Sequence, residues 1–159
     1  MRVLSIDPGL HITGYGVVDN EKRSFKLIEA GILKTSPKEK LEKRLDKIHK
    51  ALIDIIREYK PSVLVLEKLY SHYGHPTTAI LMGHARGVIC LTAGECNIPV
   101  ISYPPKRIRQ AVTGNGNASK MQVQRVIADL LNLKGPIKYT DISDALALAI
   151  GHIYMERKI

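Results

Sequence analysis

Cysteine is scarce in this sequence, which has two cysteines in 159 residues. Cys90 and Cys96 lie in one predicted helix at a spacing that turns their side chains to different sides, so no disulfide is expected between them. No further cysteine is present to complete a zinc-binding set. We therefore expect reduced, structural thiols, which excludes the disulfide-stapled secreted domains and the cysteine-based zinc domains.

Long uninterrupted apolar runs are also missing. The most apolar long stretch, residues 77–96, contains His84, Arg86 and Glu95, whereas a bilayer crossing needs about 20 mainly apolar residues. The N-terminus begins a predicted strand almost at once, without the pattern of a signal peptide. The expectation is a cytoplasmic protein that does not span a membrane.

Acidic residues are few relative to basic ones. The 15 Asp and Glu residues stand against 24 Lys and Arg residues, which gives a formal net charge of +9. Such an excess favours nucleic acid or an anionic membrane surface as a partner, although a merely soluble, charged surface explains it as well. The hydrophobic content of 45%, with no repeat, low-complexity tract or linker, predicts one globular domain over residues 1–159.

Two periodicities of the apolar residues predict the elements of this domain. Short apolar or alternating runs between turn residues predict strands, and apolar residues at helical spacing predict helices. The predicted strands are residues 2–7, 12–19, 25–35, 62–67 and 99–103, and the predicted helices start at or beside Pro37, Thr77, Lys106, Ser119 and Asp141. This order predicts an α/β fold, a mixed five-stranded sheet with helices on both faces.

Four acidic residues stand where such a fold would gather them. Asp7 and Glu67 each close an apolar run, at the strand ends beyond which sites form in open α/β sheets if the strands run parallel. Asp141 and Asp144 lie one turn apart at the start of the last predicted helix. Each acid alone has a structural explanation, such as a turn or a helix cap. Together, on a basic protein, they predict a Mg²⁺ or Mn²⁺ site and a metal-dependent nuclease.

Several short motifs follow one another in a fixed order from about residue 2 to residue 155. They are Ser5-Ile6-Asp7-Pro8-Gly9, Thr13-Gly14-Tyr15-Gly16-Val17-Val18, Leu66-Glu67, Ala85-Arg86-Gly87-Val88, Ser119-Lys120-Met121-Gln122-Val123 and Asp141-Ile142-Ser143-Asp144-Ala145-Leu146-Ala147. A single motif of this kind would be weak evidence. The ordered set resembles the RuvC family of Holliday-junction resolvases over nearly the whole chain.

The resemblance implies a ribonuclease-H-like fold and a homodimeric, Mg²⁺-dependent endonuclease, for which Mn²⁺ is expected to substitute. Such an enzyme resolves four-way DNA junctions in recombination and repair by paired, symmetric nicks that leave 5′ phosphates and 3′ hydroxyls. A branch-migration motor complex is a further implied partner. The candidate dimer interface is the predicted helix over residues 77–96, where Ala79, Gly83 and Gly87 form a smooth stripe. Packing of this stripe on the sheet is the alternative.

The resemblance also implies roles for individual residues in catalysis. The Asp7 carboxylate is expected to bridge two metal ions, with Glu67 on one side and the last-helix acids on the other. Lys120 is expected to contact the scissile phosphate or its neighbour from the start of a helix, a place suited to anions. The implied catalytic and metal-binding acids are Asp7, Glu67, Asp141 and Asp144.

A second group of residues is implied to bind DNA. Arg109, where the family often has Lys, matches a basic DNA-contacting position, and Lys106 and Arg107 are expected to grip the backbone beside it. Tyr70, where a Phe is more usual, matches the family's loop aromatic and offers a face on which bases can stack. Lys120 completes the set. Contacts to phosphate would give salt-dependent affinity with little sequence choice.

Three other classes of protein stay open on the sequence alone. A different ribonuclease-H-like nuclease would act on RNA, hybrids or flaps. An actin-like sugar kinase or ATPase also begins with an Asp-bearing strand and nearby glycines, but it needs two such domains and this chain is too short for them. A non-catalytic junction binder is disfavoured because all four acids are present.

Overall fold

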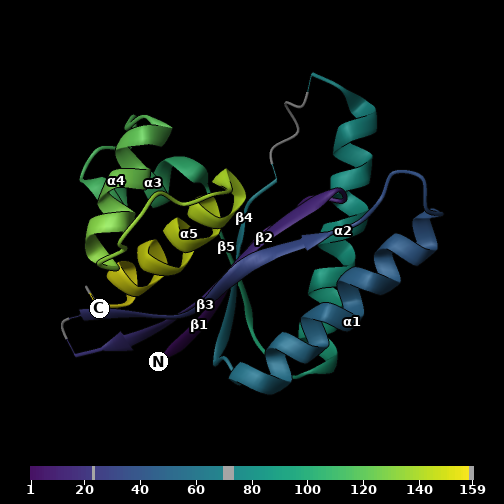
Figure 1. The fold of residues 1–159 in the computed structure, drawn as a ribbon, viewed down its shortest axis with the longest axis horizontal. Coiled ribbons are helices and arrows are strands. Elements are labelled where there is room, and N and C mark those ends of the chain that lie inside the picture. The colour runs from purple at the N-terminus through teal and green to yellow at the C-terminus, as the bar shows by residue number, and fades with distance from the viewer. Residues whose placement is uncertain (23, 70–73, 158–159) are drawn as a thin grey trace.

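The computed structural model describes residues 1–22, 24–69 and 74–157, which form five strands and five helices (Figure 1). The strands are β1 (Arg2–Asp7), β2 (Ile12–Glu21), β3 (Ser24–Lys34), β4 (Val63–Glu67) and β5 (Val100–Tyr103). The helices are α1 (Leu41–Tyr59), α2 (Pro76–Glu95), α3 (Pro105–Thr113), α4 (Lys120–Leu130) and α5 (Thr140–Glu156). Each strand and helix expected from the sequence is present.

The strands form one mixed sheet in the order β3-β2-β1-β4-β5. β1, β2 and β3 pair antiparallel, whereas β1, β4 and β5 pair parallel. Because Ile6 pairs with Leu66, the next residues, Asp7 and Glu67, stand together at the carboxyl ends of neighbouring parallel strands. The predicted mixed five-stranded sheet is confirmed, with the parallel pairing that a shared acidic site requires.

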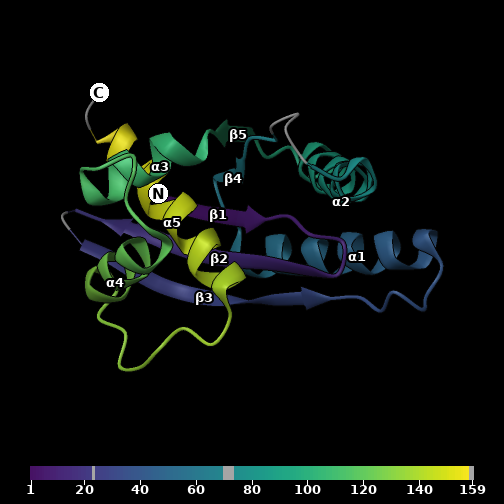
Figure 2. The ribbon, with the colours of Figure 1, turned by 90° about the horizontal axis from the view of Figure 1, so that it is seen from above.

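Helices cover both faces of this sheet (Figures 1 and 2), as predicted. α3, α4 and α5 lie on one face, where Val3 and Val65 belong to their core. α1 and α2 lie on the other, where Leu4 and Leu64 belong to a second core. Full burial of such a side chain stabilises the fold by about 1.5–3 kcal/mol. Because successive residues of β1 and β4 face opposite sides, these strands pack against both layers of helices.

α5 is the central helix of the first layer, and residues 145–153 are all buried. Two glycines of β2 allow it to approach the sheet closely. A Cβ atom at Gly14 would lie 2.2 Å from the carbonyl oxygen of Asp141, and one at Gly16 would lie 2.6 Å from Cδ2 of Leu146. Since Gly14 pairs with Asp7, the first turn of α5 is thereby brought beside the end of β1.

The start of the first helix differs from the prediction. Pro37 was expected to open it, but α1 begins at Leu41. The carbonyl of Ser36 accepts a hydrogen bond from the N–H of Glu39 at 3.1 Å, so Pro37 lies inside a turn instead. Proline at the second position of a turn has the same φ as at a helix start, which explains the error.

The two cysteines, Cys90 and Cys96, are both free thiols. Within the three described ranges, none of the helices combines the length and the apolar character that a bilayer crossing requires.

Candidate active site

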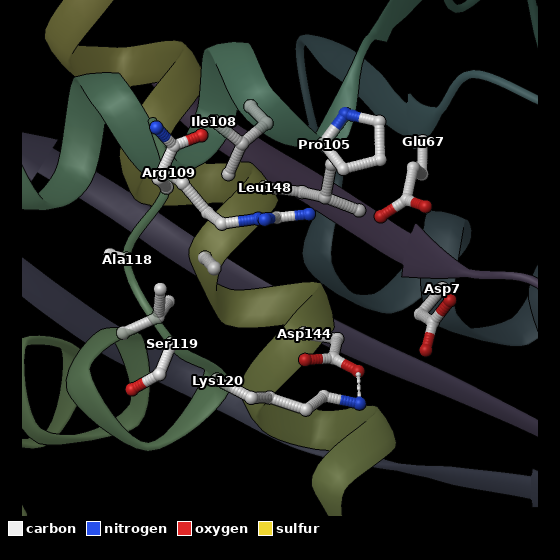
Figure 3. Close-up of a pocket in the computed structure, with 13 residues that line it drawn as sticks. Asp7, Glu67, Pro105, Ile108, Arg109, Ala118, Ser119, Lys120, Asp144 and Leu148 are labelled. Carbon is white, nitrogen blue, oxygen red and sulfur yellow. Dashed lines mark ion pairs between the residues drawn. The ribbon is translucent and has the colours of Figure 1, made fainter. Parts of the chain in front are cut away.

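A cavity of about 570 Å³ lies where the carboxyl ends of β1 and β4 meet α3, α4 and α5 (Figure 3). Asp7, Glu67 and Asp144 line it, and so do Arg109 and Lys120. Segments remote along the chain therefore bring three of the four candidate acids and two of the candidate basic residues around one space. The other lining residues are Pro105, Ile108, Asn117, Ala118, Ser119, Val123, Ala147 and Leu148.

The carboxyl group of Asp7 feels the strongest electrostatic effect in this site. Its pKa is raised to about 7, first by burial and then by the negative charges of Asp144, Glu67 and Asp141, while Lys120 opposes the rise. Burial and like charges both disfavour the ionised form of an acid. The end of β1 thus holds a carboxyl group that a nearby cation would stabilise in its charged form.

Glu67 shares this environment. Burial raises the pKa of its carboxyl group, and the charge of Asp144 adds to the rise. The positive charges of Arg109 and Lys120 act in the opposite direction on the pKa of Glu67. Both basic side chains are therefore close enough to influence the acid that closes β4.

Lys120 forms an ion pair inside the site. Its Nζ lies 2.7 Å from Oδ2 of Asp144 (Figure 3), and this hydrogen bond is the main cause of a raised pKa for the Lys120 ammonium. The position of Lys120 follows from a capping box at the start of α4, in which Gln122 N–H donates to Ser119 Oγ at 3.2 Å and Ser119 N–H donates to Gln122 Oε1 at 2.8 Å. The first turn of α4 thus presents a cation to the acids.

Asp141 lies beside the cavity and does not line it. Its main chain packs on Gly14, and its charge contributes to the raised pKa values of Asp7 and Lys120. Positions three apart on an α-helix are about 60° short of a full turn around its axis. Asp141 and Asp144 therefore project in adjacent directions, and Asp144 is the one that enters the cavity.

The residues present fit a hard divalent cation in their chemistry. Among the described residues, no three Asp, Glu, His or Cys side chains lie close enough together to hold one ion. The carboxylates instead surround the cavity, with Lys120 on Asp144. The carboxylates offer oxygen ligands, which Mg²⁺ and Mn²⁺ prefer. Burial and then the neighbouring acids raise the pKa of Asp7, and a bound cation would oppose that rise.

The other candidate DNA-binding residues fall into three places. The guanidinium group of Arg109 extends across the cavity from α3 (Figure 3). Lys106 and Arg107 are exposed on α3 outside the cavity, and the Arg107 guanidinium lies 5.7 Å from the centre of the Tyr103 ring. Tyr70 lies outside the described residues.

Sequence reasoning assigned no role to several residues around the acids. Ile108, Val123 and Leu148 give the cavity an apolar wall, which favours the raised pKa values of Asp7 and Glu67. Their helical spacing predicts a core face, but nothing local indicates that this face ends at a site.

Arg86 is a further residue near the site, and it contacts the main chain of Glu67. Its signal in the sequence is a lone basic residue in an otherwise apolar helical stretch.

This chain is similar to proteins of one named family. A family model described as crossover junction endodeoxyribonuclease RuvC matches residues 3–152. The chain belongs to the RuvC family. The crossover junction endodeoxyribonuclease RuvC of Rhodopirellula baltica is 44% identical over 151 residues, which cover 94% of this chain and 85% of the relative. That of Desulforamulus reducens is 42% identical over 152 residues, which cover 96% and 93%.

A solved structure of the RuvC family has the same fold. The structure of Thermus thermophilus RuvC in complex with a Holliday junction substrate matches this chain with a TM-score of 0.95 and 31% sequence identity. The match covers 99% of this chain and 96% of that one. The expected ribonuclease-H-like fold of the RuvC family is confirmed, and with it the resemblance seen in the motifs.

Proposed function

We propose that this chain is a structure-specific endodeoxyribonuclease that resolves four-way DNA junctions by paired, symmetric nicks, in recombination and DNA repair. The observation that carries the proposal is the convergence of Asp7, Glu67 and Asp144 on a cavity that Arg109 and Lys120 also line. Carboxylate oxygens around one cavity are the donors that Mg²⁺ and Mn²⁺ prefer, and the basic residues would hold a phosphodiester. Support comes from relatives named crossover junction endodeoxyribonucleases and from the junction substrate bound to the Thermus thermophilus protein.

The proposed cofactor is Mg²⁺, with Mn²⁺ as a substitute and two ions in each active site. Asp7, Glu67, Asp141 and Asp144 would hold the ions. Mg²⁺ held there supplies Lewis acidity for in-line attack of water on the phosphodiester, with a 5′ phosphate and a 3′ hydroxyl as the products. The pKa of about 7 for Asp7 supports this proposal, because a bound cation would favour the ionised carboxylate.

The basic residues of the site have distinct proposed tasks. Lys120, now paired with Asp144, would exchange that partner for the scissile phosphate or its neighbour, close to the N-terminus of α4. Arg109 would hold a phosphate across the cavity through its planar guanidinium. Lys106 and Arg107 would contact the DNA backbone outside the cavity, and such contacts give affinity that falls steeply with salt.

A homodimer would place one active site on each of two opposed strands of the junction. The proposed interface is the exposed face of α2, where Ile80 is 62% exposed and Leu91 is 60% exposed. Gly83 and Gly87 have open space where a Cβ atom would stand, so a second chain can approach closely there. One domain over residues 1–159, a cytoplasmic location and a branch-migration motor complex as a further partner complete the proposal.

Incubation with a labelled synthetic four-way junction tests the function directly. With Mg²⁺ we expect two symmetric nicks whose ends DNA ligase can reseal, and with chelator we expect none. Matched linear duplex, flap and RNA–DNA hybrid substrates are expected to stay intact. Cleavage of a flap or hybrid at the rate of the junction would identify the alternative class of ribonuclease-H-like nuclease.

The Asp7→Asn variant separates catalysis from binding in the same assay. It keeps the size of the side chain but removes the charge that would help to hold the ions. We expect loss of cleavage with junction affinity near that of the unsubstituted protein. Cleavage by this variant at the unsubstituted rate would show that the metal site lies elsewhere.

A further inference from the structure

Arg86 connects α2 to the end of β4 that carries Glu67. Its Nη1 donates a hydrogen bond to the main-chain carbonyl oxygen of Glu67 at 2.6 Å, and its Nη2 donates to Oγ of Ser102 on β5 at 2.7 Å. Thr92 of the same helix instead bonds to His49 of α1, at 2.8 Å. Arg86 is thus a partly buried link from this helix to two neighbouring strands of the sheet.

The main-chain carbonyl of Glu67 lies just beyond the last residue of β4 that pairs with β1. The β1–β4 pairing ends at Ile6 and Leu66. The following backbone hydrogen bond, from Lys68 N–H to the Tyr103 carbonyl at 2.9 Å, is directed to β5. A partly buried carbonyl without a donor is costly. Arg86 supplies that donor at the β4 residue whose side chain enters the cavity.

The contact acts on the main chain of Glu67 and not on its charge. The side chains that shift the pKa of Glu67 are Asp144, Arg109 and Lys120. The ion pairs found among the described residues do not include Arg86. A guanidinium holds its five N–H groups in one fixed plane, so the bond from Nη2 to Ser102 sets the direction of the bond from Nη1 to Glu67.

We propose that Arg86 is a positioning residue of the active site. By holding the main chain of Glu67, it fixes the depth at which the Glu67 carboxylate enters the cavity beside Asp7, ready to bind a divalent cation. The inference rests on the proposed metal-dependent function. Because α2 also carries the proposed dimer surface, Arg86 ties each active site to the helix that would meet the second subunit.

Direct binding of Mn²⁺ to the metal-stripped full chain, followed by electron paramagnetic resonance of the free ion, tests this role. Arg86→Gln removes the charged donor pair and is expected to weaken Mn²⁺ binding by about 10–100-fold, as is usual for residues that support metal ligands. Arg86→Lys keeps the charge and a single donor group, so it is expected to recover part of the affinity. Junction binding without metal is expected to be unchanged, because Arg109 and Lys120 are intact.

Two further variants make the result specific. Ser102→Ala removes the second anchor but leaves the bond to Glu67, so it is expected to weaken Mn²⁺ binding less than Arg86→Gln. Arg57→Gln, which removes an exposed cation from the last turn of α1, is expected to change nothing.

Wild-type Mn²⁺ affinity in a cooperatively folded Arg86→Gln protein would overturn the proposal. If Arg86→Gln does not fold, unchanged Mn²⁺ binding in both Arg86→Lys and Ser102→Ala would overturn it. Failure of the unsubstituted chain to bind Mn²⁺ at all would instead overturn the metal-dependent function, and this inference with it.

Discussion

The ammonium group of Lys120 lies 2.7 Å from a carboxylate oxygen of Asp144. The Lys120 side chain is 60% exposed and that of Asp144 is 28% exposed, so water reaches the pair. Ion pairs in such surroundings contribute about 0–1 kcal/mol. Exchange of partners therefore costs little. Lys120 is paired with Asp144 as the protein stands, and its ammonium group would be free to contact DNA if Asp144 held a divalent cation.

Lys120→Gln is predicted to separate metal binding from catalysis. Removal of a cation that competes for Asp144 should leave Mn²⁺ affinity equal to or higher than that of the unsubstituted chain. Junction cleavage should fall by about 10²–10³-fold, as when one charge-stabilising group is removed from an active site. Metal titration and single-turnover cleavage measure the two effects, with the exposed Lys134→Gln as control. A loss of Mn²⁺ affinity in Lys120→Gln would show that Lys120 does not compete with the metal ion for Asp144.

The stability of the metal-free protein is predicted to fall as pH rises from about 4 to about 7. Asp7 has a folded-state pKa of about 7 against an ordinary value of 3.8, so the folded state binds this proton more tightly than the unfolded state. At about 1.36 kcal/mol per pKa unit, the loss amounts to a few kcal/mol and levels off above the folded-state pKa. Urea unfolding in chelator at the two ends of this pH range measures it.

Asp7→Asn should flatten that pH profile, because its side chain does not ionise. The variant is expected to be more stable than the unsubstituted protein above pH 7 and similar to it in mild acid. Asp54→Asn, on the exposed side of α1, serves as the matched control. An equally steep profile in Asp7→Asn would assign the effect to another group.

Gly14→Ala is predicted to damage the site through the main chain. The added methyl group would lie 2.2 Å from the carbonyl oxygen of Asp141, so the first turn of α5 must move away from Asp7. Overpacking of this kind costs about 1–3 kcal/mol, and Mn²⁺ binding and junction cleavage should fall with it. Gly135→Ala, where the methyl group meets open space, is the control. Full cleavage activity in Gly14→Ala would show that this close approach is dispensable.

Leu91→Lys is predicted to disrupt the proposed dimer. Leu91 is 60% exposed in the chain and would be covered by a second subunit, where an unpaired ammonium is costly. Sedimentation should show a monomer, and junction cleavage should yield single nicks. Met121→Lys, at a residue 61% exposed on α4, should leave the sedimentation of the protein unchanged. Monomeric behaviour of the unsubstituted chain would remove α2 as an interface.

The acidic edge of the sheet is largely predictable from the sequence. Parallel strands that are covered on both faces read as continuous apolar runs, and the runs that end at Asp7 and Glu67 show where β1 and β4 stop. Their neighbouring positions then follow from the parallel pairing. Local cap chemistry likewise predicts the start of α4, because Ser119 and Gln122 interact within a single turn.

Contacts that depend on docking between elements are not predictable in this way. The pairing of Lys120 with Asp144 depends on how α4 rests beside α5, and nothing near either residue encodes that arrangement. Asp144 lines the cavity and Asp141 does not. This difference depends on the packing of the Asp141 main chain against Gly14 of β2. The bond from Arg86 to Glu67 crosses from a helix to a strand end, and sequence spacing carries no trace of it.

The burial of α5 couples the proposed cleavage activity to complete folding of the chain. The helix that forms the centre of one core also carries Asp144 in its first turns. In a nascent or heat-damaged chain whose α5 is not docked on the sheet, Asp144 does not lie beside Asp7 and Glu67 at the cavity. The proposed nuclease activity would therefore be acquired only when the chain has finished folding, and it would be lost as soon as α5 leaves the core.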